Sequence, residues 1–163
     1  MADFSKDSNY SKSSANISDI NSLEGSGRIP PQAVEVEEAV LGSMLIEHEA
    51  ATIALQMLKK SDFYKPANQH IFDVLHDLYE RDNPLDLLTV ENELRDRSLL
   101  EACGGPGYLA DLTRSVSSAA NVEYHAEIIA EKAIKRNLIL SCTDVIKEAY
   151  DSTTDPFDVL DKA

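Results

Sequence analysis

Cysteine is scarce in this chain of 163 residues, which contains only Cys103 and Cys142. Neither cysteine has a Cys or His partner at a zinc-binding spacing, so we interpret both as reduced, small core residues. Long apolar runs are also missing, which argues against a membrane-spanning helix. We therefore expect a cytoplasmic protein that makes no contact with a membrane.

Basic residues are few compared with acidic ones. The chain has 15 Lys and Arg against 29 Asp and Glu, which gives a formal net charge of −14. Proteins that bind nucleic acid need a cationic surface to neutralise phosphates. We therefore expect no direct DNA or RNA binding by this chain, and protein partners instead.

Motifs for catalysis or cofactor binding are missing as well. There is no G-x-x-x-x-G-K-[ST] sequence, and the glycine cluster from Gly104 to Gly107 has no following Lys, so it is interpreted as a turn. Ser43 lacks the second glycine of a nucleophile elbow, and the carboxylates are interpreted as a solvated acidic face. No histidine pair has metal-ligand spacing. We predict no catalytic residue, no cofactor and no metal in this chain.

The first 27 residues differ in composition from the rest. They are rich in Ser, Asn, Asp and Gly, and their few apolar residues follow neither a helical nor a strand period. Such a segment cannot bury enough apolar surface to offset its ordering entropy. We predict a disordered tail over 1–27 and folded protein over 28–163.

Apolar periodicity and helix-breaking residues predict helices almost throughout the folded part. The clearest helix runs from Asn68 to Tyr79, with Pro66 in its first turn and a polar cluster closed by Pro84 after it. A proline pair opens an earlier amphipathic helix with acidic residues in its first turn. Three further helices are expected over 49–58, over 87–97 with Asp86 as the cap, and over 108–112.

A long helix is predicted over 121–150, where there is no Gly or Pro and where Asn121 can serve as the N-cap. It would be on the order of 45 Å long. One stripe should pack on a core: Val122, Ala126, Ile129, Ala133 and Leu140. The second half is apolar around most of its circumference and therefore needs cover on several sides.

The chain then turns, and a helical pattern restarts at Pro156 and reaches Ala163 without a cap. We expect the second arm of an antiparallel hairpin, truncated at the end of the sequence. The predicted fold class is all-α, with a helical globular subdomain over 28–120 and a helical hairpin over 121–163.

Several motifs resemble the N-terminal domain of DnaB-type replicative DNA helicases. They occur in the order found in that family and cover essentially all of 28–163: Pro30-Pro31, Val34-Glu35-Val36-Glu37, Val40-Leu41-Gly42, Asp62-Phe63-Tyr64, His70-Ile71-Phe72, Pro84-Leu85-Asp86-Leu87-Leu88-Thr89, Gly104-Gly105, Tyr108-Leu109-Ala110, and Ser118-Ala119-Ala120-Asn121 with Tyr124 and Ala126. Two positions depart from the family pattern. Asn68 stands where a His is frequent and Ser117 stands where a Pro is frequent, and we interpret both as surface or turn positions.

The resemblance implies a role in assembly. In this family the domain is a helical globule with a long hairpin, hairpins of neighbouring subunits pair to form a collar on a hexameric ring, and primase docks on that collar. The resemblance leaves open whether a helicase loader also binds to the collar. The ATP- and Mg-binding RecA-like domain, which gives the full-length protein its ATP-dependent 5'-3' helicase activity, is absent from this sequence, so we expect no enzymatic activity from this chain.

Five residues are candidates for partner contact. Four of them lie on the second half of the predicted long helix, which has more apolar residues than one core requires: Ile139, Val145, Ile146 and Tyr150. The fifth is Tyr108, an aromatic residue directly after the glycine turn. The alternative for all five is a place in the internal core. Two other functions stay open: an acidic helical adaptor unrelated to replication, and an enzyme with an unrecognised helical active site.

Overall fold

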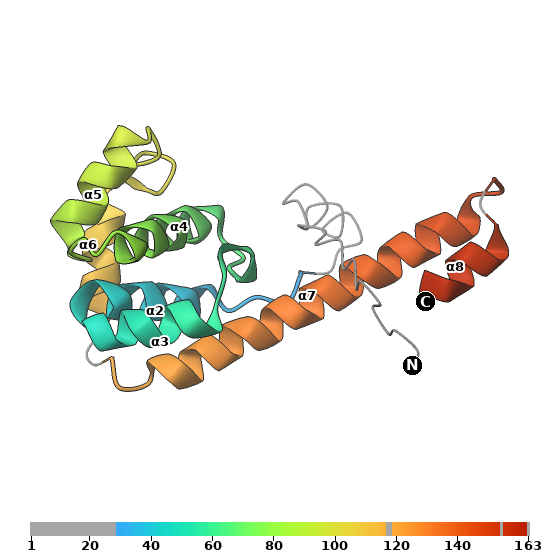
Figure 1. The fold of residues 1–163 in the computed structure, drawn as a ribbon, viewed down its shortest axis with the longest axis horizontal. Helices are drawn as coiled ribbons and strands as arrows, with labels where there is room; N and C mark the ends of the chain where they lie inside the picture. Colours follow the sequence, from blue (N-terminus) through green and yellow to red (C-terminus); the bar gives the residue numbers. More distant parts are fainter. Residues whose placement is uncertain (1–28, 117–118, 154, 163) are drawn as a thin grey trace, which may run out of the picture.

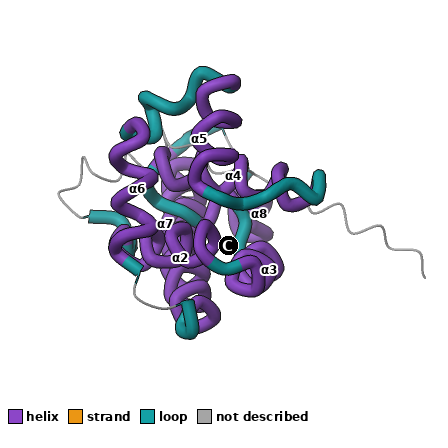
Figure 2. Tube along the Cα trace, turned by 90° about the vertical axis from the view of Figure 1, so that its left-hand side faces the viewer, coloured by secondary structure: helices purple, strands orange, loops and turns teal. Residues whose placement is uncertain are grey.

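The computed structural model describes residues 29–116, 119–153 and 155–162. These residues form helices and loops only, which confirms the all-α prediction (Figures 1 and 2). The predicted tail over 1–27 lies outside the described residues. No helix in the described part is both long enough and apolar enough to cross a membrane.

Seven α-helices and one short 3-10 helix make up the described chain. A globule contains α2 to α6 and the first half of the long helix α7, whereas the second half of α7 projects away and α8 folds back along it (Figure 1). The elements in chain order are α2 (Val34–Ile46), α3 (His48–Met57), η1 (Lys60–Asp62), α4 (Pro66–Glu80), α5 (Leu87–Asp96), α6 (Gly105–Ser115), α7 (Val122–Tyr150) and α8 (Pro156–Lys162).

The core lies around α2, which packs against α3, α4, α6 and α7. The predicted stripe of α4 is buried, since Ile71, Val74, Leu75 and Leu78 are at most 2% exposed. The rings of Phe63 and Phe72 contact each other with centroids 4.8 Å apart. The apolar period read from the sequence therefore identifies the buried face of the central helices.

Local sequence signals set most helix boundaries. Pro66 is the first residue of α4, as predicted, because the first helical turn needs no backbone donor there. The Asp86 carboxylate accepts hydrogen bonds from the backbone N–H groups of Leu88 and Thr89, both at 3.0 Å, which confirms it as the cap of α5. The prediction for Asn121 is wrong in one respect, since it precedes α7 but its side chain makes no capping hydrogen bond.

The glycine cluster is only partly a turn. Gly104 and Gly105 have φ angles of 90° and 72°, which favour glycine, but α6 already begins at Gly105. Pro106 and Gly107 therefore lie inside the helix, in the first turn, where a missing N–H is tolerated. The prediction of a turn through Gly107 and a helix from Tyr108 was wrong by three residues.

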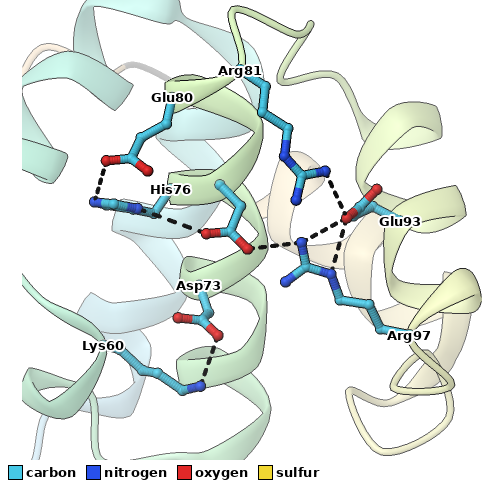
Figure 3. A network of polar contacts seen from close by, with 8 residues as sticks. Lys60, Asp73, His76, Glu80, Arg81, Glu93 and Arg97 are labelled. Carbon is cyan, nitrogen blue, oxygen red and sulfur yellow. Dashed lines mark hydrogen bonds and ion pairs between the residues drawn. The ribbon is translucent and has the colours of Figure 1, made fainter.

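Ion pairs connect α4 to α5 on the surface of the globule (Figure 3). Arg97, directly after α5, lies 2.8 Å from Asp77 of α4 and 2.6 Å from Glu93 of α5. Arg81, directly after α4, lies 3.4 Å from the same Glu93. Because these groups are partly exposed, each pair contributes up to about 1 kcal/mol. The network holds α5 in place but adds little to the stability of the core.

Candidate protein-interaction surface

The first half of α7 belongs to the globule. Val122, Ala126, Ile129 and Ala133 are at most 4% exposed and face α2 and α3, as predicted. Leu140, which the sequence placed on the same stripe, is instead half-buried. The buried stripe ends one turn earlier, at Arg136, which is 3% exposed.

A second apolar stripe lies roughly on the opposite side of α7. Ile134 lies five residues after Ile129, which at 3.6 residues per turn is about 1.4 turns. The extra 0.4 or so of a turn places Ile134 close to the face opposite Ile129. Ile134 and Leu138 are each 59% exposed, and Val145 is half-buried. We call Ile134, Leu138 and Val145 the Leu138 stripe.

A third set of apolar residues runs along the outer half of α7, defined as residues 137–150. Ile139, Ile146 and Tyr150 are separated by seven and four residues, so they share one face of the helix. Their exposed fractions are 39%, 56% and 88%. We call them the Ile146 stripe, and Val145 lies on the Leu138 stripe instead.

The return helix α8 covers α7 only in part. Val159 is 9% exposed, whereas Phe157 and Leu160 are 75% and 68% exposed. Cys142, on the outer half of α7, is also exposed, so its predicted place in the core was wrong. Cys103 is buried, as predicted. The hairpin therefore carries exposed apolar side chains on both of its helices.

Tyr108 lies apart from the other four candidates, on α6 in the globule. Its hydroxyl lies 2.6 Å from Asn68 Oδ1 and 2.9 Å from Glu38 Oε1, and it accepts a hydrogen bond from Lys65 Nζ at 3.0 Å. The Lys65 ammonium also lies 4.1 Å from the ring centroid. Burial, and then the neighbouring Glu38, raise the pKa of the Tyr108 hydroxyl well above its usual range. The side chain is half-buried, so part of it remains accessible.

Sequence reasoning missed a buried carboxylate beneath Tyr108. Glu37 is 1% exposed and accepts hydrogen bonds from the backbone N–H groups of Tyr64 and Lys65, at 2.7 and 3.3 Å, and from Asn68 Nδ2 at 2.9 Å. Burial raises the pKa of Glu37, and the hydrogen bonds and the charge of Arg136 oppose that rise. Glu37 is therefore structural and not part of a solvated acidic face.

Asn68 and Ser117, the two departures from the family pattern, were both interpreted as surface or turn positions. Asn68 is fully buried and bridges Glu37 and Tyr108, so its assignment to the surface was wrong. An amide suits this position because it donates to the carboxylate while it accepts from the hydroxyl. Ser117 lies outside the described residues.

Exposed apolar side chains on a projecting helical hairpin are typical of protein-interaction surfaces, since isolated soluble domains rarely leave contiguous apolar patches uncovered. The described residues thus form an all-helical globule with a projecting hairpin, and the hairpin exposes apolar side chains on both of its helices. Residues 29–131 match the family model described as "DnaB-like helicase N terminal domain". The chain belongs to this family of DnaB-like helicase N-terminal domains.

Relatives support the family assignment over most of the chain. It is 51% identical over 136 residues to the replicative DNA helicase DnaB of Rhodothermus marinus and 41% identical over 136 residues to the replicative DNA helicase DnaC of Bacillus subtilis (strain 168), each alignment covering 83% of this chain. The aligned region is only 14% and 30% of those two relatives. The crystal structure of the N-terminal domain of DnaB helicase from Mycobacterium tuberculosis matches with a TM-score of 0.78 and 41% identity, covering 82% of this chain and 94% of that one.

Proposed function

We propose that this chain is the assembly and primase-docking domain of a hexameric replicative DNA helicase. The observation that carries the proposal is the pair of apolar stripes on α7, the Leu138 stripe and the Ile146 stripe, which the described residues of the chain leave largely exposed. Family membership adds the context, because the relatives that share this domain are replicative DNA helicases. In this proposal the hairpin pairs with a second copy of itself and the remaining apolar surface receives primase.

The two stripes fit two partners because they lie on different faces of one helix. A contact that covers the Leu138 stripe leaves most of the Ile146 stripe accessible, and the reverse also holds. The exposed Phe157 and Leu160 of α8 extend the apolar area on the same hairpin. Tyr108 is a separate candidate contact on the globule, where its accessible edge lies next to Lys65 and Glu38.

The acidic surface supports a protein partner over nucleic acid. With a net charge of −14 the chain repels phosphate backbones, so DNA binding falls to other parts of the full-length helicase. ATP and Mg bind, in this proposal, to the RecA-like domain that lies outside this sequence, and the domain works at the replication fork in the cytoplasm. A helicase loader is a further candidate partner for the same hairpin.

The proposal is tested by adding a charge to each stripe. We expect Val145→Glu and Ile146→Glu to weaken association of the chain with itself or with the helicase-binding domain of primase at least tenfold, because a carboxylate would be buried without a partner. Sedimentation velocity, with and without that primase domain, measures the change. Lys147→Glu is the matched control, since Lys147 is exposed and polar on the same turn.

The outcomes separate the parts of the proposal. If a variant loses only self-association or only primase binding, and keeps its helical circular dichroism signal, the stripe that carries the substitution is assigned to the partner that was lost. If both variants associate as the unchanged chain does, the stripes are not the interface. If the unchanged chain binds neither itself nor primase, the proposed function is wrong.

A further inference from the structure

The point where α7 leaves the globule is marked by a buried arginine. Arg136 is 3% exposed and is the one basic side chain that is buried among the described residues. It continues the stripe of Ile129 and Ala133, so it occupies a position where the pattern would place an apolar residue. From residue 137 to residue 150, every residue of α7 is at least partly exposed. Arg136 is therefore the last buried residue of the helix.

The guanidinium group joins three segments that are far apart in the sequence. Arg136 Nη1 donates a hydrogen bond to the Pro31 carbonyl at 2.8 Å, and Nη2 donates to the Asp62 carbonyl at 2.5 Å. The guanidinium also lies over the ring of Tyr64, 5.8 Å from its centroid. One planar group thus bonds the segment before α2 and the end of η1 at the same time.

This arrangement depends on the shape of arginine as well as on its charge. Burial lowers the pKa of Arg136, and the nearby carboxylates of Glu37 and Asp62 attract the guanidinium and offset part of that effect. Both direct hydrogen bonds, however, go to backbone carbonyls, whose positions are fixed by the fold. Two donors at a fixed angle can bond both carbonyls only within a narrow range of guanidinium positions, which restricts where α7 can lie. A lysine ammonium, in contrast, is a point charge on a flexible stem.

A fixed orientation matters because of the length that projects beyond it. Residues 137–150 extend about 21 Å at 1.5 Å per residue. A tilt of about 10° at Arg136 would move the end of such a helix by about 4 Å, roughly the distance between two contacting side chains. The position of the hairpin relative to the globule is therefore sensitive to what happens at this residue.

We propose that Arg136 is an orienting residue, which fixes the direction in which the hairpin projects from the globule. It acts through the carbonyls of Pro31 and Asp62 and touches no partner. The inference concerns the geometry of the chain itself and goes beyond the proposed function. It holds whether or not the hairpin binds primase or a second copy.

The inference is tested by a distance between the hairpin and the globule. Cys142 is exposed and accepts a spin label, and a second label is introduced by Leu88→Cys on α5, where the side chain is 65% exposed. Double electron–electron resonance is then recorded on the 163-residue chain, diluted with unlabelled protein so that only distances within one molecule contribute. We expect a narrow distribution for this doubly labelled chain and at least a twofold broader one for Arg136→Met.

Two further variants keep the test decisive. Arg136→Lys retains the charge but cannot bond both carbonyls in the same way, so we expect an intermediate width even if Arg136→Met does not fold. Arg114→Met, which removes an exposed arginine paired with Asp111, should leave the width unchanged. If folded Arg136→Lys or Arg136→Met keeps the narrow distribution, the inference is overturned.

Discussion

The inner and outer halves of α7 form one continuous helix but face different environments. In the inner half, Val122, Ala126, Ile129 and Ala133 are covered by other helices of the same chain. In the outer half, Ile139, Ile146 and Tyr150 are exposed on a projecting arm. Both halves are rich in apolar residues, so apolar content alone does not say which residues stabilise the fold and which are free to bind.

What distinguishes the halves is the polar chemistry around them. The globule encloses Glu37, Asp62, Asn68 and Arg136, and every buried side-chain nitrogen or oxygen in the described residues has a hydrogen-bond partner. Leaving such a group unpaired is costly, so the globule should tolerate few substitutions. The outer half has no buried residue on α7 and should tolerate many. Variants in the two regions should therefore separate stability from association.

The largest effect is expected from Glu37→Ala. This change removes the carboxylate that accepts hydrogen bonds from the N–H groups of Tyr64 and Lys65 and from the amide of Asn68. A buried donor that loses its acceptor costs about 1–3 kcal/mol. Asn68 is buried but the Tyr64 and Lys65 N–H groups are only part-buried, so we expect the free energy of unfolding to fall by about 3–5 kcal/mol, less than three times the upper value. Urea denaturation followed by circular dichroism measures the loss. A loss below 1 kcal/mol would show that water replaces the carboxylate.

The pH dependence of stability provides a second measurement at the same site. Burial raises the pKa of Glu37 and of Asp62 above their ordinary values of 4.5 and 3.8. Between the ordinary and the raised pKa, the folded chain keeps a proton that the unfolded chain has lost, so the free energy of unfolding falls as pH rises through that window. We expect a shallower fall in Glu37→Ala, with the remainder due to Asp62. An identical slope in both proteins would contradict the raised pKa of Glu37.

An intermediate effect is expected where α2 and α6 approach closely. A Cβ atom on Gly42 would lie 2.1 Å from the Leu112 carbonyl oxygen and 2.7 Å from a methyl group of Val116, so Gly42→Ala must push the helices apart. We expect a loss of about 1–3 kcal/mol in thermal or urea unfolding. Gly107→Ala is the matched control, because its Cβ meets nothing within 4 Å. It should instead stabilise α6 by about 0.5–1 kcal/mol. Equal effects of the two changes would rule out the close approach as the cause.

Local patterns made most of the fold predictable. The stripe of α4, the cap at Asp86 and the uninterrupted α7 depend on residues close together in sequence, and each was identified correctly. The exposed side chains of the Ile146 stripe also follow from the excess of apolar residues in one helix. Their partners stay a prediction, because a single chain does not show what covers them.

Contacts between distant residues could not be predicted in this way. A glutamate in a first helical turn normally faces water, and Glu37 is buried only because Tyr64 and Asn68 approach from 27 and 31 residues away. The same holds for Arg136, whose acceptors are 105 and 74 residues away. Cys142 shows the converse, since a small residue type common in cores is here exposed. Sequence periodicity predicts which face of a helix is buried, but it does not predict which polar groups from distant segments will contact that face.

The smallest effect on stability is expected on the Leu138 stripe. Ile134→Ala should change the free energy of unfolding by no more than about 0.5 kcal/mol, because the side chain is 59% exposed and leaves no cavity. Ile129→Ala, the same change on the buried stripe of the same helix, should cost about 2–5 kcal/mol. Unfolding is measured at low protein concentration so that association does not add to stability. A loss above 1 kcal/mol for Ile134→Ala under these conditions would mean that its own chain covers this face, which would remove Ile134 from the surface available to partners.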